Sequence, residues 1–180
     1  MVLKQLIFCF LLLSFGKSTN DETIAWNSSR KLTWNDFKAN PNNESDAVAL
    51  TASGISFGYS VKTSDKKIVE VSTEVKAIFY PNKSWYFKGK SDKQILKHEQ
   101  LHFDITELYA RKFRAQLSKL SMHRHVKKEM DNMHVTINKA LNDTQKRYDK
   151  ETNHSLNKEQ QKQWEAIIAK ALAELEVYKS

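Results

Sequence analysis

Two hydrophobic periodicities follow one another along this chain of 180 residues, and their order restricts the possible folds. Apolar side chains alternate with polar ones over residues 55–61 and again over residues 69–79, which is the pattern of half-buried β-strands. The short polar connection at residues 63–67 predicts that the two strands form a hairpin. Residues 85–87 fit a short third or edge strand.

After Gly89 the apolar residues recur every three or four positions, which predicts helices in the rest of the chain. Ser91 or Asp92 can cap the first helix, polar breaks follow at residues 121–125 and 151–155, and Asn157 or Ser155 can cap the last helix. Strands followed by helices indicate an α+β fold, with an N-terminal antiparallel sheet and a helical C-terminal half.

The first residues have the pattern of a secretory signal. Lys4 precedes an apolar run over residues 6–15, and small or polar residues follow. The run is shorter than the roughly 20 residues that a transmembrane helix needs. We therefore expect residues 1–18 to be a signal peptide, residues 19–180 to form a single domain without a transmembrane segment, and the protein to be periplasmic or secreted. Cys9 is the sole cysteine, so the processed chain would carry no thiol.

The formal net charge of +8 raises the question of a nucleic-acid partner. Basic residues are spread along the sequence, and adjacent ones occur as pairs such as Lys66-Lys67 and Lys127-Lys128 rather than as blocks. This distribution favours a solvated surface over a nucleic-acid footprint, so no nucleic-acid partner is expected.

The chemically informative segment is H-E-x-x-H at residues 98–102, near the start of the first predicted helix. Residues four apart lie on one helix face, so His98 and His102 can bind one Zn²⁺ together. Glu99 points elsewhere and can act as a general base on a water activated by the zinc.

A catalytic zinc needs a third protein ligand and one open position. The spacing leaves several candidates, which are a carboxylate or one of His123, His125, His134 and His154. His154 lies in the break between two helices, where a side chain can be directed at another element. His134 falls in an apolar helical stripe, which is typical of a packed histidine, and His123 and His125 flank Arg124 in a polar loop.

Residues 96–111, which read LKHEQLHFDITELYAR, resemble the signature of a bacterial family of predicted secreted zinc-dependent proteases, catalogued as domain of unknown function 922. Further parts of the resemblance are Trp34-x-x-Phe37, Tyr148-Asp149, Thr152-x-His154 and Trp164. Together they cover about residues 30–175. The chain departs from the family pattern at Ser155, where a glycine is expected.

The resemblance implies a zincin-like domain in which His98, His102 and His154 are the Zn²⁺ ligands and Glu99 is the base. It also implies weaker supporting roles near the site, assigned to Asp104, Glu107, Arg111 and Tyr148. Zincins commonly bind an extended peptide along a sheet edge, which residues 68–79 or 85–87 could provide.

The leading hypothesis is therefore an exported zinc metallohydrolase, a peptidase that acts on a peptide or protein substrate. One alternative is a zinc-binding but non-catalytic interaction domain of the cell envelope. Another is a helical adaptor in which the motif is accidental. The oligomeric state is left open.

Overall fold

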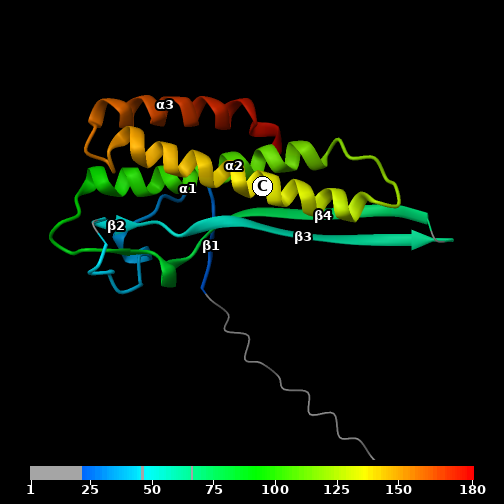
Figure 1. The fold of residues 1–180 in the computed structure, drawn as a ribbon, viewed down its shortest axis with the longest axis horizontal. Helices are drawn as coiled ribbons and strands as arrows, with labels where there is room; N and C mark the ends of the chain where they lie inside the picture. The colour runs from blue at the N-terminus through cyan, green and yellow to red at the C-terminus, as the bar shows by residue number, and fades with distance from the viewer. Residues whose placement is uncertain (1–21, 46, 66) are drawn as a thin grey trace, which may run out of the picture.

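The computed structural model describes residues 22–45, 47–65 and 67–180. The expected signal peptide, residues 1–18, lies outside the described residues. The fold is α+β, as predicted, with an antiparallel sheet followed by three α-helices in the described part of the chain (Figure 1).

The two predicted strands form a long hairpin. β3 (Ser53–Ser64) pairs antiparallel with β4 (Lys67–Phe79), and the register sets Ile55 opposite Ala77. The short strand β1 (Ile24–Ala25) joins this sheet beside the last two residues of β4. Ile55, Ala77 and Phe79 are buried while their neighbours Ser56 and Lys76 are exposed, so one face of the hairpin covers the core.

A second, two-stranded sheet pairs β2 (Ala49–Leu50) with β5 (Trp85–Tyr86), which confirms a short strand in the predicted region. Three short 3₁₀ helices complete the described elements: η1 (Trp34–Asp36), η2 (Pro81–Lys83) and η3 (Glu176–Tyr178).

The helices begin where the sequence predicts. α1 (Lys93–Leu117) is capped by Asp92, whose carboxylate accepts hydrogen bonds from the backbone N–H groups of Gln94 and Ile95. α2 (Val126–Thr152) follows the polar loop, and α3 (Lys158–Glu174) is capped by Asn157. None of the helices in the described part is long and apolar enough to cross a membrane.

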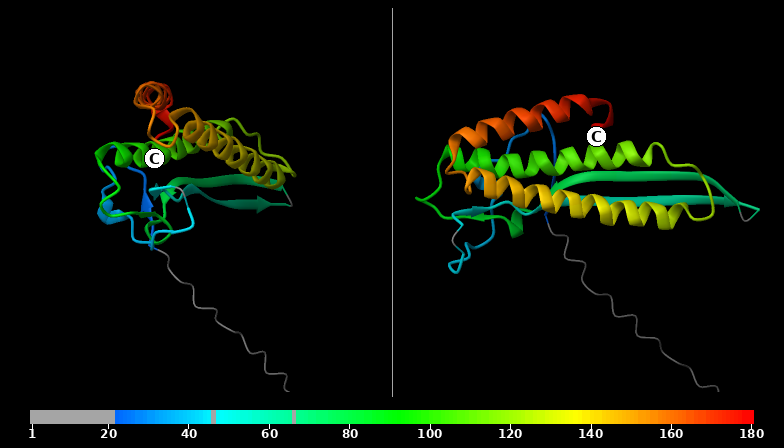
Figure 2. Two further views of the ribbon diagram at one scale, coloured as in Figure 1. Left: turned by 60° about the vertical axis from the view of Figure 1, so that its left-hand side comes forward. Right: turned by 45° about the horizontal axis from the view of Figure 1, so that its top comes forward.

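The elements stack in three layers, with α1 and α2 on the hairpin and α3 on the far side of both helices (Figures 1 and 2). α1 packs against the sheet, α2 and α3, so it is buried on several faces. Its residues Phe103, Ile105 and Phe113 have almost no exposed surface. The helix that carries the H-E-x-x-H motif is thus the central element of the core.

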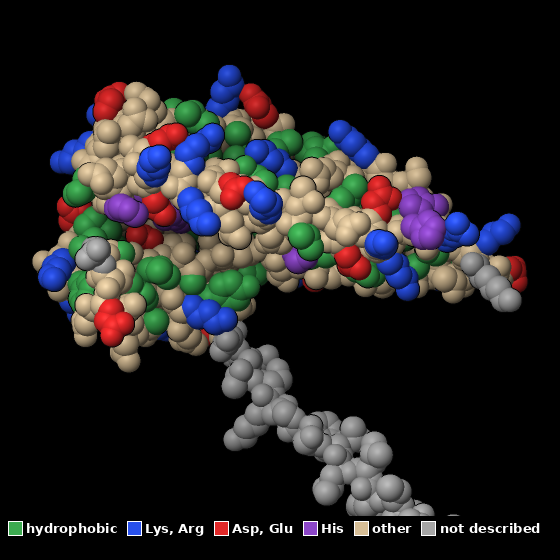
Figure 3. All heavy atoms as spheres, viewed as in Figure 1, with side chains coloured by type: hydrophobic (Ala, Val, Ile, Leu, Met, Phe, Trp, Pro, Cys, Tyr) green, Lys and Arg blue, Asp and Glu red, His purple; other side chains and the backbone are tan. Residues whose placement is uncertain are grey.

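The charged side chains of the face shown in Figure 3 are scattered along the whole molecule, with acidic groups among the basic ones.

A buried ion cluster attaches the C-terminus to α1. The Glu107 carboxylate, which is completely buried, accepts hydrogen bonds from Arg111 at 2.9 Å and from Arg114 at 3.1 Å. Arg111 also donates to the backbone oxygen of Leu172 and to Glu176, and Arg114 donates to the backbone oxygen of Tyr178. The pair Glu107–Arg111 is therefore a core interaction and not a pair on the helix surface.

We predict that Glu107→Gln destabilises the protein by about 3 kcal/mol, because it removes the charge of the buried carboxylate that pairs with both Arg111 and Arg114. The measurement is the free energy of unfolding from urea titrations followed by circular dichroism. Glu176→Gln is the control, since the Glu176 side chain is 59% exposed, and its effect should be much smaller. Equal effects of the two substitutions would contradict the prediction.

Candidate metal centre

The first turns of α1 bring the two motif histidines together. His98 and His102 lie one helical turn apart, and their Nε2 atoms are 3.2 Å from each other. His98 is 3% exposed, and the His102 side chain is 12% exposed. The pairing that the motif predicts is therefore present, at a mostly buried position.

A carboxylate from α2 completes the group. Asp149 Oδ1 lies 2.9 Å from His102 Nε2 and 3.1 Å from His98 Nε2. His98, His102 and Asp149 form the metal group, the one cluster of potential ligands found among the described residues that could hold a metal ion. The Asp149 side chain is 31% exposed, so the group is open to solvent on this side.

Two glutamines orient the imidazole rings. Gln145 Oε1 faces His102 Nδ1, and Gln161 Oε1 faces His98 Nδ1 at 3.1 Å. The amide nitrogen of Gln145 donates to the backbone oxygen of His102, and that of Gln161 donates to Glu165, which fixes both amide orientations. An amide oxygen can only accept, so each Nδ1 carries a hydrogen and each neutral ring presents a lone pair at Nε2.

The metal group therefore directs three electron-pair donors, two nitrogens and one oxygen, at a common point. Such an arrangement is stable only with a cation among the donors, which is either a metal ion or additional protons on the histidines.

The pKa values of His102 and Asp149 describe the state without a metal ion, in which protons supply the positive charge. Burial lowers the pKa of His102, but the hydrogen bond with Asp149 and the charges of Glu99 and Asp149 outweigh it, so the net pKa is raised. Burial likewise raises the pKa of Asp149, but its hydrogen bonds with His102 and His98 dominate and hold the pKa far below the usual range. Without a metal, Asp149 stays ionised and His102 holds its proton more tightly than a free histidine.

Tyr148 packs against the rings of both histidines. Its ring stacks on His98 at 4.5 Å between centroids and meets the His102 ring edge-on at 4.8 Å. The hydroxyl donates to Gln161 Oε1 at 2.7 Å and to the backbone oxygen of His98 at 3.3 Å. Burial raises the pKa of Tyr148, so the hydroxyl stays a donor and keeps the glutamine oxygen in place.

Glu99 differs from every other carboxylate near the site. It is 5% exposed, and among the described residues its carboxylate has no hydrogen-bond or ion-pair partner. Its charge contributes to the raised pKa of His102, so it lies within electrostatic reach of the metal group. Glu99 is therefore a nearly buried, unpaired carboxylate beside two histidines.

His154, the third ligand that the family resemblance implies, is not part of the metal group. Its side chain is 71% exposed, and Nδ1 lies 3.9 Å from Asp149 Oδ1. Asn153, His154 and Ser155 have consecutive positive φ values of 48°, 50° and 76° after the end of α2. A glycine would suit this left-handed conformation, so the glycine that the resemblance predicts at the position of Ser155 fits the backbone here.

The sequence indicates Asp149 only as part of a Tyr-Asp pair. One signal could have indicated it as a ligand: Gln145 and Asp149 are four residues apart on the predicted second helix and therefore share a face. The partner of that face lies about fifty residues away in the chain, so the sequence does not connect them.

Three of the residues predicted to support the site lie elsewhere. Asp104 accepts hydrogen bonds from Trp26 and Gln100, and so attaches the N-terminal segment to α1. Glu107 and Arg111 belong to the buried ion cluster. The histidines take their orientation from Gln145 and Gln161 instead, because these amides stand on the helices that face the rings.

The other histidines are placed as the sequence predicts. His134 packs on Phe57 and Phe113, with ring centroids 5.2 Å and 5.7 Å away. His123 and His125 are exposed in the loop before α2.

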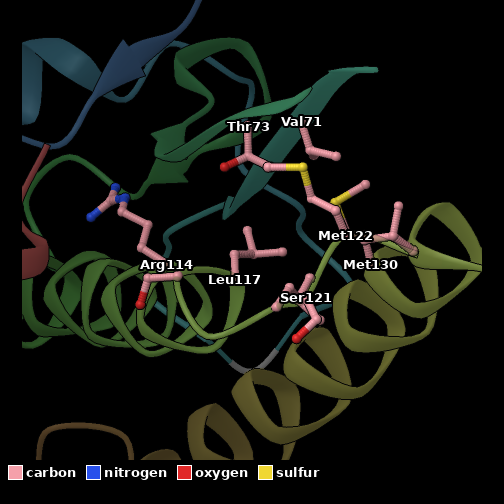
Figure 4. A pocket seen from close by; sticks show the side chains of 10 residues that line it. Val71, Thr73, Arg114, Leu117, Ser121, Met122 and Met130 are labelled. Carbon is pink, nitrogen blue, oxygen red and sulfur yellow. The ribbon is translucent and has the colours of Figure 1, made fainter. Parts of the chain in front are cut away.

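A hollow of about 270 Å³ lies at the other end of α1, away from the metal group. Val71, Arg114, Leu117, Met122 and Met130 are among the residues that line it (Figure 4). It contains none of the candidate ligands.

Comparison with known proteins gives one match. The model of a family described as bacterial protein of unknown function (DUF922) matches residues 23–155, which is most of the chain. No curated protein and no solved structure matches.

The assignment of the third ligand can be tested by zinc titration. We predict that Asp149→Asn weakens zinc binding by more than about 100-fold, because it removes the carboxylate from the metal group. His154→Asn should weaken it by less than about tenfold. The measurement is the zinc dissociation constant by competition with a chromogenic chelator. The reverse order would assign the third position to His154.

Zinc affinity should also fall as the pH drops, because protons compete with the metal for the two Nε2 atoms. Since the pKa of His102 is raised, the loss should begin above pH 6.5, the ordinary histidine value. Asp149 adds nothing in this range because its pKa is low. We expect the dissociation constant to rise about tenfold or more per pH unit below the histidine pKa. A constant affinity between pH 8 and pH 5 (a range of about three units) would refute histidine ligation.

Proposed function

We propose that this chain, which belongs to the DUF922 family of bacterial proteins of unknown function, is an exported zinc-dependent peptidase. The observation that carries the proposal is the metal group with the unpaired Glu99 beside it. Export is supported by the signal-like pattern of residues 1–18.

The donor set fits zinc in composition and in spacing. Two imidazoles and one carboxylate are a common set for catalytic zinc, with the fourth position left open. Donors bound tetrahedrally to zinc at ordinary bond lengths lie about 3.3 Å apart. The donor atoms of the metal group are 2.9, 3.1 and 3.2 Å apart, so a small ion could bind with minor side-chain movement.

When bound to His98, His102 and Asp149, zinc would supply a Lewis acid that activates water and polarises a carbonyl group. The chain's own contribution starts with the two glutamines. By accepting hydrogen bonds from Nδ1, Gln145 and Gln161 hold both Nε2 lone pairs towards the metal.

Glu99 is the proposed general base. Its carboxylate is free of other partners, so it can accept a proton from the attacking water and then donate that proton to the leaving amine. A carboxylate in an ion pair would be a weaker base, because the counter-charge would stabilise its ionised form.

The proposed substrate is an extended peptide. β1 pairs with β4 at Ile78 and Phe79, and the backbone N–H of Trp26 extends this contact to Ala77. β3 forms one edge of the sheet. The start of β3 contacts α1, since the hydroxyl groups of Ser53 and Thr106 are hydrogen-bonded at 2.8 Å and the nearby Thr51 donates to the backbone oxygen of Glu99. A peptide strand added beside this segment would run past the metal group.

A zinc-binding domain without catalytic activity would use the same ligands. The state of Glu99 favours the enzyme, because a purely structural site gains nothing from a nearly buried and unpaired negative charge.

The substitution Glu99→Gln separates the two possibilities. We expect it to lower peptidase activity by about 10²–10⁴-fold and to leave one equivalent of zinc bound, because it removes the base and no ligand. Activity would be followed with a library of fluorogenic peptides and unfolded proteins, and zinc by elemental analysis.

Equal activity of wild type and Glu99→Gln, or no activity of the zinc-loaded wild type on any of these substrates, would favour the non-catalytic role. Absence of zinc after purification with added zinc would reject both.

A further inference from the structure

A second cavity lies between the first turns of α1 and α3, which begin at the same end of the molecule (Figure 1). Its volume of about 410 Å³ is within the range of small-ligand pockets. Four of its lining residues are lysines, two from each helix: Lys93, Lys97, Lys158 and Lys162. We call this the lysine cavity.

The four lysines have no counter-charge of their own. None has an ion-pair or hydrogen-bond partner among the described residues. The acidic residue in the lining is Glu165, which already accepts a hydrogen bond from Gln161. The lining residues therefore include four exposed lysines without a partner and a single carboxylate.

This arrangement is unfavourable for stability in two ways. The lysines form two pairs at spacing i, i+4, and like charges at this spacing repel each other. They also lie in the first two turns of their helices, where the helix dipole disfavours positive charge. Local rules broken without visible compensation are typical of functional positions.

The helix ends themselves do not explain the cavity. Asp92 caps α1 and Asn157 caps α3, so these side chains already occupy backbone N–H groups of both first turns. The attraction for a ligand must come from the lysine side chains.

We propose that the lysine cavity binds an anion that carries phosphate groups. Lysines suit phosphate because they act as separate point charges around it, whereas carboxylates are usually recognised by the planar fork of arginine, which the lining lacks. The ligand could be a free phosphate compound or the head group of a phospholipid, since both present the same chemistry.

The cavity is adjacent to the metal group but separate from it. Gln161 lines the cavity and also orients His98, while none of the four lysine side chains forms a hydrogen bond or an ion pair with a residue of the metal group. The proposal therefore does not depend on the peptidase activity, and the two can fail independently.

The test measures binding of inorganic phosphate to the zinc-loaded protein by calorimetry. We expect one site with a dissociation constant below about 1 mM at low salt. The double substitution Lys97→Gln/Lys158→Gln should weaken binding by about tenfold or more, because it removes one charge from each helix. The matched control is Lys127→Gln/Lys128→Gln, which removes two exposed lysines from the first turn of α2 and should leave binding unchanged.

Thermal unfolding gives a second measurement. Without phosphate, the variant at Lys97 and Lys158 should be at least as stable as wild type, because the repulsion is relieved. Phosphate should raise the melting temperature of wild type and of the control, and raise that of the cavity variant much less.

A third experiment distinguishes a phospholipid head group from a free phosphate compound. Vesicles of phosphatidylglycerol and of phosphatidylcholine would be sedimented with wild type and with the cavity variant. Binding to the anionic vesicles that depends on the lysines indicates a head group, and phosphate binding without vesicle binding indicates a free solute.

Three results would overturn the proposal. They are no binding of phosphate or vesicles by wild type, binding that persists in the cavity variant, and equal loss in the control. Binding that is kept in the cavity variant but lost in Asp149→Asn would place the phosphate on the metal instead.

Discussion

The contact between the His98–His102 pair of α1 and Asp149 of α2 is the interaction on which the proposed chemistry depends. It joins two helices across about fifty residues of sequence. The contact is strengthened by the ring of Tyr148, which precedes Asp149 and stacks on His98. Because α1 is also packed against the hairpin and α3, the histidines stand on an element that cannot easily shift.

The same contact requires a positive charge between the donor atoms. Three electron-pair donors meet where Gln145 and Gln161 already occupy the other ring nitrogens, so a positive charge is needed between them. Protons can satisfy it, which is why the pKa of His102 is raised and that of Asp149 is lowered. A metal ion bound by the three donors would supply the positive charge as well.

Charge is used in a different way in the rest of the molecule. In the buried ion cluster, Glu107 pairs with two arginines, and these arginines connect the C-terminal segment to α1. In the lysine cavity, positive charges are gathered and left without partners. The net charge of +8 appears diffuse along the sequence and on the face in Figure 3, yet two lysine pairs about sixty residues apart come together in space.

The order of the elements and the histidine pair could be predicted from the sequence, because both depend on neighbours along the chain. Alternation at residues 55–61 and 69–79 predicted the hairpin, and a cap at Ser91 or Asp92 predicted the start of α1. The spacing of His98 and His102 placed both on one helix face. Asp149 in the metal group, the glutamines behind the histidines, the burial of Glu107 and the lysine cavity depend on how helices pack against each other. That packing brings together residues whose separation in sequence carries no regular spacing, so only the tertiary structure decided it.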